Sequence, residues 1–338
     1  MRTSAEDAVT GGPAGPLVSV VVPAYNSAWS LDETLASVCG QTYSHLEVLV
    51  VDDGSTDATA EVAAAWSRRD PRVRLISKPN GGVASARNRG MREAVGMYVA
   101  PIDSDDLWEP DNVERQVAAL EAAGPDACMA FAHSVFVDPD NRPLPAAAWS
   151  PWESRSGPPK PPETDFRGLL LRNSVANGSA AVFRRDRMLE VGGYDEGLRS
   201  AGAEGAEDWK LTLSLAARGQ VVYVPAATVR YRMSRSSMSR AIPAMRRSVL
   251  MVIDHARRHG PRLAPWTYWH ARTLMLVWML PRAVRSGQWR QALGLAFGAY
   301  VLNPLWWRNP EPWTLIWRTC TTGLGEVLKH RRRSAQAR

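Results

Sequence analysis

The sequence predicts an α/β fold in which helices flank a mostly parallel β-sheet. The runs "LVSVVVP" at 17–23, "HLEVLVVDD" at 45–53 and "RVRLISK" at 72–78 are rich in β-branched and apolar residues, as expected of strands buried on both faces. Stretches of helical periodicity separate these runs, and alternating strands and helices favour a doubly wound parallel sheet. Hydrophobic residues make up 45% of the 338-residue chain, which is enough for a globular core.

The first half of the chain continues this alternation. Ser30 and Glu33 form a capping-box pattern that predicts the start of the first helix. Pro110 fits the first turn of a later helix, where its missing N–H costs nothing. The other expected elements are a helix from Thr56 or Asp57, a helix following "NGGVASARNRG" at 80–90, a strand over 96–102 and a helix over 110–123.

The second half departs from the regular pattern. The Pro-rich stretch at 138–165 is predicted to be a functional or disordered loop because of its length. Beyond Pro243 the pattern predicts helices punctuated by proline. Between them we expect a strand over 127–137, a strand in "NGSAAVFRRD" at 177–186, a glycine-rich turn at 191–198, a helix over 207–219 with Gly219 as its C-cap, and two short strands in "QVVYVPAATVRYR" at 220–232.

The termini and the cysteines indicate a compartment. Residues 1–16 lack the apolar run of a signal peptide and are predicted to be a flexible tail. Three widely spaced cysteines fit neither a disulfide framework nor a metal knuckle: Cys39, Cys128 and Cys320. We therefore expect a reducing, cytoplasmic environment.

The charge is unevenly distributed. Lys and Arg number 24 against 31 Asp and Glu up to residue 239, and 17 against 3 from residue 240 onward, where eight of the fourteen tryptophans also lie. Such a tail suggests an anionic partner. Nucleic acid is disfavoured because no recognition motif accompanies the charge. Two alternatives stay open for the basic, Trp-rich extension at 241–338: contact with the inner face of a membrane, or packing of its helices on the rest of the chain.

Polar motifs come directly after the predicted strands. They are "PAYN" at 23–26, "DDGSTD" at 52–57, "NGG" at 80–82 and "DSDD" at 103–106. In an open α/β sheet these positions meet at the edge where ligands bind. Two acidic clusters with no His or Cys nearby suit Mg²⁺ or Mn²⁺ bridging a nucleoside diphosphate.

Each motif alone has a simpler explanation. "DDGSTD" fits a turn with a helix cap, and "NGG" fits an ordinary turn. "DSDD" resembles a calcium loop, but Trp108 stands where such a loop needs glycine. The paired acids of "VVDDGSTD" also resemble a phosphoacceptor receiver domain, which would carry them after the first strand rather than the second.

As a set, the motifs resemble the GT-A glycosyltransferases of family 2. The resemblance rests on "VSVVVPAYN", "VLVVDDGSTD", "NGGVASARNRG", "DSDDLW", "AAVFRRDRMLEVGGYDEGL" and "AEDWKLTLSLAARG", and it covers about residues 17–235. It implies a Rossmann-like GT-A domain at 17–240, followed by the helical extension. It also implies an inverting transfer of a sugar, of hexosyltransferase type, from a nucleotide-diphosphate donor to a glycan, lipid-linked or secondary-metabolite hydroxyl, as in cell-envelope polysaccharide synthesis.

The resemblance also implies roles for individual residues. Asp208 falls on the general base and Glu207 on its helper in acceptor binding. Asp105 and Asp103 fall on the D-x-D motif that holds the metal, and Asp106 on a supporting position. The residues implied in binding the nucleotide-sugar are Pro23, Ala24, Tyr25, Asp53, Gly82, Arg87, Asp103 and Ser104.

Two points counter this implication. Asp208 also fits a helix-capping acid, which the helix dipole stabilises by about 0.3–1 kcal/mol. Family members often carry His in a Y-R-x-H pattern, whereas this chain has Ser234 there; Arg235 or Arg240 could hold the diphosphate instead. A catalytically silent scaffold that binds a nucleotide-sugar or a glycan is therefore the alternative function.

Overall fold

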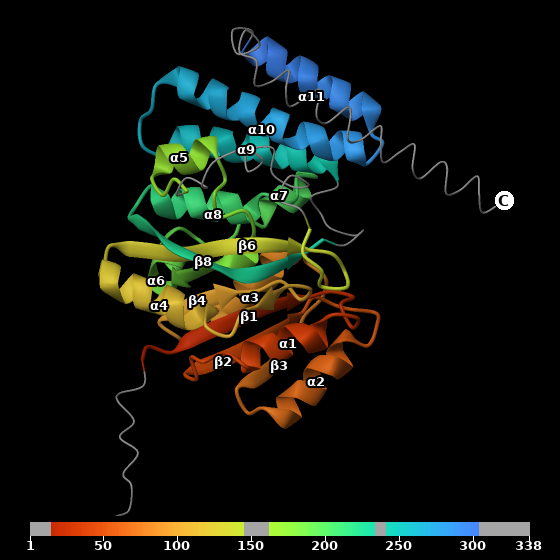
Figure 1. Ribbon diagram of the computed structural model, residues 1–338, viewed down its shortest axis with the longest axis vertical. Coiled ribbons are helices and arrows are strands. Elements are labelled where there is room, and N and C mark those ends of the chain that lie inside the picture. Colours follow the sequence, from red (N-terminus) through yellow and green to blue (C-terminus); the bar gives the residue numbers. More distant parts are fainter. Residues whose placement is uncertain (1–14, 145–161, 234–240, 304–338) are drawn as a thin grey trace, which may run out of the picture.

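The computed structural model describes residues 15–144, 162–233 and 241–303 (Figure 1). One eight-stranded mixed sheet, in the order β3-β2-β1-β4-β7-β6-β8-β5, forms the centre of the fold. Its strands are β1 (Val18–Ala24), β2 (Leu46–Asp52), β3 (Val73–Ser77), β4 (Tyr98–Pro101), β5 (Leu107–Trp108), β6 (Ala127–Val137), β7 (Ala181–Arg184) and β8 (Gln220–Arg232).

The first four strands confirm the parallel block. β1 pairs in parallel with β2 and β4, and β2 with β3. The register places Ala24 beside Asp52, and Asp52 beside Ser77, so these three strands end at one edge. β7 then runs antiparallel to both β4 and β6, while β6 and β8 are parallel. The loops after β1, β2, β3 and β4 therefore meet along one rim.

Helices cover the sheet and extend beyond it. In Figure 1, α1 and α2 lie at one end of the molecule, and α8, α9, α10 and α11 are stacked toward the other. The described helices are α1 (Leu31–Cys39), α2 (Thr59–Arg69), α3 (Val83–Glu93), α4 (Asn112–Ala123), α5 (Phe166–Leu171), α6 (Arg185–Glu190), α7 (Gly197–Ser200), α8 (Glu207–Ala216), α9 (Ile242–His259), α10 (Pro265–Arg285) and α11 (Trp289–Leu302), with a 3₁₀ turn at Gly178–Ala180.

Three local predictions need correction. Helix α1 starts directly after Ser30, as predicted, but Ser30 makes no side-chain cap bond, because its hydroxyl donates to the Ser104 carbonyl at 2.8 Å. The third helix begins at Val83, inside "NGGVASARNRG" rather than after it. The region 220–232 is one long strand, β8, instead of two short ones. Its pairing with β6 continues across several register shifts.

The end of α8 also differs from the expectation. The helix ends at Ala216 with Ala217 as its C-cap, so Gly219 lies beyond it. A side chain at Gly219 would collide with the Asp126 carbonyl and the Cys128 sulfur, so this glycine permits a close approach to the start of β6. Its role is therefore tight packing rather than helix capping.

The C-terminal helices share the hydrophobic core of the sheet. Ile242, Val249 and Ile253 of α9 belong to the same buried cluster as the strands, as do Leu276 and Leu280 of α10. α9 packs on α8, and α10 packs on α9, α5 and α11. Among the helices that the structure describes, none is long and apolar enough to cross a membrane. The predicted boundary between the GT-A domain and the helical extension, at 240/241, falls next to residues 234–240, which lie outside the described residues.

Candidate active site

Asp53 organises the loop after β3. Its side chain is only 3% exposed and accepts from Lys78 Nζ at 2.5 Å. The amides of Gly81 and Gly82 donate to the same carboxylate at 2.9 and 2.7 Å. These bonds explain why an acid stands after β2, since it fixes the "NGG" turn against the neighbouring strand. The pairing of Asp53 with a nucleobase stays a prediction.

At the same edge of the sheet, one predicted binding residue has an exposed side chain and another lies in a tight turn. Pro23 and Ala24 are buried within β1, whereas Tyr25 is 53% exposed immediately after it. Gly82 has a φ of +87°, which side chains rarely adopt, and a Cβ there would lie 2.5 Å from Arg199 Nη1. Of the residues predicted to bind the nucleotide at this edge of the sheet, Tyr25 therefore has an exposed ring that is free to stack on a nucleobase.

The D-x-D motif lies after β4 in a loop fixed from two sides. The Asp103 amide donates to Ser179 Oγ at 3.0 Å, and its carboxylate accepts from Arg87 Nη2 at 2.5 Å. The Ser104 carbonyl accepts from the hydroxyls of Ser30, just before α1, and of Thr34 on α1, at 2.8 and 3.0 Å. Hydroxyls from α1 and from the 3₁₀ turn thus hold the acidic loop in place.

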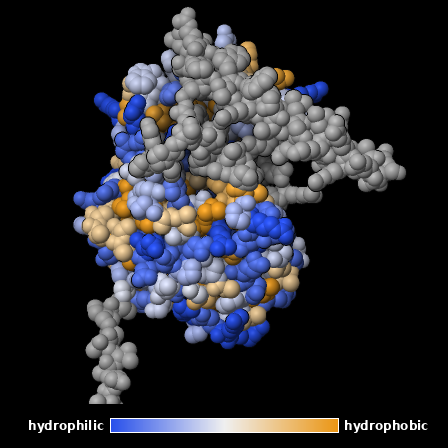
Figure 2. All heavy atoms as spheres, viewed as in Figure 1, coloured by the Kyte–Doolittle hydropathy of each residue, from blue (hydrophilic) through white to orange (hydrophobic). Residues whose placement is uncertain are grey.

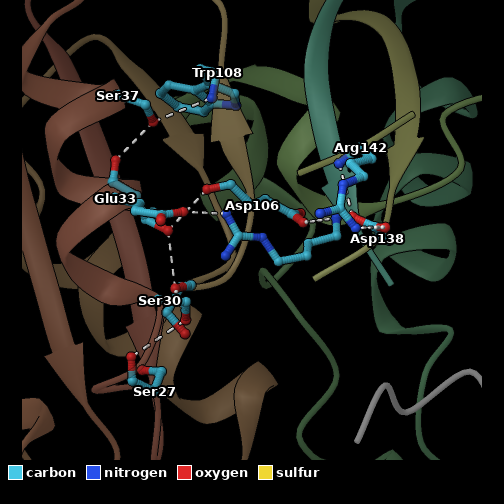
Figure 3. A network of polar contacts seen from close by, with 11 residues as sticks. Ser27, Ser30, Glu33, Ser37, Asp106, Trp108, Asp138 and Arg142 are labelled. Carbon is cyan, nitrogen blue, oxygen red and sulfur yellow. Dashed lines mark hydrogen bonds and ion pairs between the residues drawn. The ribbon is translucent and has the colours of Figure 1, made fainter. Parts of the chain in front are cut away.

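Asp106 is fully buried behind the motif. Its Oδ2 accepts from Ser179 Oγ at 2.5 Å and its Oδ1 from the Arg232 amide at 2.9 Å. Figure 3 shows the surrounding network, in which Glu33 and Ser37 on α1 lie close to Asp106 and Trp108. Burial, together with the charges of Asp105 and Asp103, raises the pKa of Asp106. Its bonds connect the loop after β4 to the 3₁₀ turn and to β8.

Asp105, unlike Asp103, lacks a cationic partner among the described residues. No Lys or Arg of the described residues lies within ion-pair distance of it. Burial and then the charge of Asp103 raise its pKa to about 6. A buried acid beside other acids is stabilised by a cation, and hard oxygen donors suit Mg²⁺ or Mn²⁺. The donor set therefore fits a divalent metal.

That donor set is small. Within the part of the chain that the structure describes, no group of three or more His, Cys, Asp or Glu side chains is arranged as a metal site. Two carboxylates are nonetheless sufficient where substrate phosphates complete the coordination, which is the usual situation for Mg²⁺. The position where the family often has His, Ser234, lies outside the described residues. So do the two arginines that could replace it, Arg235 and Arg240.

The second acidic pair begins α8. Glu207 is buried and accepts from Arg87 Nη1 at 2.8 Å. Asp208 is half-buried, and burial, then the charge of Glu207, raises its pKa to about 7, while Arg87 opposes the rise. Its Oδ1 accepts from the Trp209 amide at 2.6 Å, so its position in the first turn also suits the helix dipole. A carboxyl with such a pKa is suited to general-base work near neutral pH.

Arg87 joins the two acidic groups. Its side chain is 2% exposed and binds Asp103 through one terminal nitrogen and Glu207 through the other. The ring of Tyr194 lies 5.2 Å from its guanidinium. The sequence predicted a donor-binding role for Arg87; the structure describes it as a buried bridge between the acid after β4 and α8.

Four further residues complete the site, and the sequence did not assign them roles. Ser179 and Arg232 support Asp106. The Tyr194 hydroxyl is buried without a hydrogen-bond partner among the described residues. Tyr231 adjoins the acids, and burial, then the charges of Asp106, Asp103, Asp105 and Asp208, raises its pKa. The motifs "GGYDEGL" and "YRMSR" contain the two tyrosines, which was the available signal.

These features define a class of protein. A mixed sheet whose parallel strands end at the acidic sequence Asp103–Ser104–Asp105, with a helix that begins with two acids nearby, is the arrangement of a GT-A fold. The chain belongs to glycosyl transferase family 2, whose family profile matches residues 19–191.

Comparisons with known proteins agree with this assignment. The chain is 50% identical over 99 residues to a chondroitin synthase of Pasteurella multocida, covering 29% of this chain and 10% of that one. It is 41% identical over 103 residues to a putative teichuronic acid biosynthesis glycosyltransferase, TuaG, of Bacillus subtilis, covering 30% and 41%. The matched part is thus less than half the length of either relative.

Solved structures share the fold. A mannosyltransferase of Pyrobaculum calidifontis in complex with GDP-Man and Mn²⁺ matches with a TM-score of 0.57 and 22% identity, covering 91% of this chain and 87% of that one. TarS 1–349 of S. aureus in complex with UDP matches with a TM-score of 0.53 and 20% identity, covering 79% and 71%. Both confirm the predicted GT-A architecture.

Proposed function

We propose that this protein is an inverting glycosyltransferase that moves a sugar from a nucleotide-diphosphate donor to an acceptor hydroxyl. The observation that carries the proposal is the buried connection through Arg87, which brings the D-x-D acid Asp103 and the α8 pair Glu207–Asp208 into one site. We propose that the donor-binding acids and the base lie on the two sides of this Arg87 bridge. Family membership and the nucleotide-bound structural neighbours support a nucleotide-sugar donor.

On the donor side, Asp103 and Asp105 are the residues proposed to hold Mg²⁺ or Mn²⁺. Such an ion, when bound, stabilises the negative charge that develops on the departing nucleoside diphosphate. Asp106, Ser179 and the α1 hydroxyls keep the two acids in position. Tyr25, Asp53, Gly82 and Ser104 line the proposed nucleotide side together with the end of β1.

On the acceptor side, Asp208 is proposed to accept the proton of the attacking hydroxyl. Its raised pKa makes the carboxylate a stronger base than an exposed aspartate, while Arg87 limits that rise. Glu207 is held by Arg87 and orients the start of α8. With one base and no second nucleophile in the proposed mechanism, a single displacement inverts the anomeric centre.

The acceptor is proposed to be a glycan, a lipid-linked sugar or a secondary metabolite. Relatives named for chondroitin and teichuronic acid support a polysaccharide of the cell envelope. We place the reaction in the cytoplasm, at the inner face of the membrane. Free cysteines at Cys39 and Cys128 agree with a reducing compartment.

A thermal-shift panel tests the donor. Nucleotide diphosphates and nucleotide-sugars are each added with and without Mn²⁺, since a ligand of the folded state raises the melting temperature. We expect one donor to give a shift that needs the metal and that Asp105→Ala removes. If no nucleotide gives a metal-dependent shift, the donor assignment is wrong.

Transfer assays then separate an enzyme from a silent scaffold. With the donor identified, wild type is expected to release nucleoside diphosphate in the presence of acceptor glycans, and Asp208→Asn to bind donor without releasing it. A protein that binds donor but shows no turnover with any acceptor tried supports the scaffold instead, whereas turnover that Asp208→Asn leaves unchanged shows that Asp208 is not the base.

A further inference from the structure

After Arg290 and Gln291 in its first turn, the last described helix, α11, is apolar around its circumference. Ala292, Leu295 and Ala299 are buried on the side that packs against α10. Large apolar side chains occupy the other side and are exposed to solvent: Trp289 (43%), Leu293 (72%), Phe297 (69%), Tyr300 (52%) and Val301 (59%). A helix that is hydrophobic all round is normally covered on both sides.

The exposed side chains form one continuous surface. Residues spaced by three or four positions lie on the same side of a helix, and Leu293, Phe297, Tyr300 and Val301 have that spacing. We call these four residues and Trp289 the α11 face. Apolar side chains reach the surface at the upper edge of Figure 2, where Figure 1 places α11. Contiguous exposed apolar surface of this kind marks an interaction site.

We propose that the α11 face docks on an anionic lipid bilayer, with the helix lying in the plane of the interface. The proposal goes beyond glycosyl transfer, since it concerns a surface outside the active site. Leucine and phenylalanine would enter the acyl boundary, and the aromatic rings would sit at headgroup level, where Trp and Tyr are preferred.

Charge favours lipid over a second copy of the chain. Residues 265–302 contain four arginines and no Asp or Glu, so two such surfaces would repel each other, whereas anionic headgroups attract them. Within α10, the guanidinium of Arg282 lies 3.6 Å from the Trp278 ring centroid. Such pairs suit an interface, where the cation reaches the headgroups and the ring reaches the acyl chains.

The start of α10 adds aromatic surface of the same chemistry. Trp266 and Trp269 are 59% and 57% exposed. Asp254 of α9, a neighbour of the α10–α11 helix pair, is paired with Arg272 of α10. The described part of this helix pair therefore presents apolar and basic groups together, which is the composition of a helix that lies on a membrane.

Vesicle co-sedimentation of the full-length chain tests the proposal. The probes are vesicles of phosphatidylcholine alone and of phosphatidylcholine mixed with phosphatidylglycerol. Wild type is expected to sediment with the anionic vesicles and to dissociate as salt rises. The double variant Leu293→Ser/Phe297→Ser is expected to lose about tenfold in binding, and Arg290→Glu to weaken binding to the anionic vesicles only.

A matched control separates docking from general apolar exposure. Val95, which is as exposed as Leu293 at 72%, precedes β4 far from α11 in the sequence, and Val95→Ser is expected to bind vesicles like wild type. Circular dichroism and the donor-induced melting shift should be unchanged in both variants. The proposal fails if the double variant binds as wild type does, if wild type binds no vesicle, or if light scattering shows a dimer that the double variant converts to monomer.

Discussion

Arg87 and Glu207 are 120 residues apart in the sequence, yet they form a buried ion pair of 2.8 Å. The other terminal nitrogen of Arg87 binds Asp103 at 2.5 Å. One guanidinium thus fixes the distance between the acid after β4 and the first turn of α8. Arginine suits this position because its planar fork binds two carboxylates at once, which an ammonium group cannot reproduce.

The first prediction concerns this bridge. Arg87→Lys keeps the charge but cannot span both acids, so we expect transfer to slow by about a hundredfold through misplacement of Asp208 relative to the donor. Steady-state kinetics should show the loss mainly in kcat. Arg89→Lys, on the exposed side of the same helix, is the control and should retain full activity. Wild-type kcat in Arg87→Lys would contradict the positioning role.

Removal of the same charge should also affect folding. Arg87→Met leaves Asp103 and Glu207 without their shared cation in a buried site, which typically costs about 3–5 kcal/mol of unfolding free energy. Urea denaturation measures it. Addition of Glu207→Gln to Arg87→Met should restore part of the lost unfolding free energy. If the two residues did not interact, the destabilisations of the two single variants would simply add.

The second prediction concerns the pH dependence of the reaction. Asp208 must be deprotonated to accept a proton, and its pKa is raised to about 7, so kcat/KM should rise with pH and level off above about pH 7. Because the charge of Glu207 contributes to that rise, Glu207→Gln should move the midpoint to lower pH. A profile in Glu207→Gln with the wild-type midpoint would exclude Asp208 as the titrating group.

Asp208→Asn supplies the complementary measurement. The amide has nearly the shape of the carboxyl but accepts no proton, so transfer should fall by about 10²–10⁴-fold. Donor-induced thermal shifts should remain, because the role proposed for Asp208 is in activating the acceptor. Glu204→Gln, an exposed position in the loop before α8, is the control.

The third prediction concerns stability without ligand. Asp105 has a pKa of about 6 in the folded chain against an ordinary value of 3.8. Between these values the folded state holds a proton that the unfolded chain has released, so the unfolding free energy falls as pH rises through this window. Asp105→Asn should therefore stabilise the ligand-free protein by about 1–3 kcal/mol at pH 7 and leave it unchanged below the unfolded pKa.

Thermal denaturation at several pH values checks this. Asp140→Asn, an exposed acid paired with Arg142, is the control and should change the melting temperature little. The stabilised Asp105→Asn variant should also lose the metal-dependent donor shift. An Asp105→Asn variant that is less stable than wild type at pH 7 would contradict the picture of an uncompensated acid.

The fourth prediction concerns the "NGG" turn. Gly82 and Gly124 both have strongly positive φ angles, +87° and +84°, but a Cβ at Gly82 meets Arg199 whereas one at Gly124 meets nothing within 4 Å. Gly82→Ala should therefore cost more than the about 1–2 kcal/mol expected for backbone strain at Gly124→Ala. Chemical denaturation measures the difference, and Arg199→Ala in the Gly82→Ala background should remove most of it.

The apolar runs were sufficient to predict the parallel block of the sheet, whereas the antiparallel pairings of β7 and β5 left no such signal. β1, β2 and β3 lie side by side in the parallel block, and the motifs after them meet at one rim because parallel strands end together. The distant partners of side chains leave no such signal in the sequence. Glu33 matched a capping box, but it pairs with Arg232, 199 residues away.

Arg87 illustrates the same limit. The resemblance carried by "NGGVASARNRG" implied a donor-binding role for Arg87, but only the folded chain shows its pairing with Glu207. Tyr194 and Tyr231 likewise lie in recognisable motifs, and their proximity to the charged groups of the site depends on segments that meet across the sheet. Local sequence patterns predict helices, strands and the edge of the sheet at which loops meet. The partners of a buried charged side chain depend instead on the topology of the fold.

Ser179 has a consequence for engineering of this fold. Its hydroxyl accepts from the Asp103 amide and donates to Asp106, although it lies in the turn just before β7. A chimera that exchanged acceptor-side segments between relatives at a boundary before Gly178 would separate this hydroxyl from the loop it supports. Grafts that aim to change acceptor choice should therefore keep residues 177–184 with the donor half and exchange only the chain beyond Arg184.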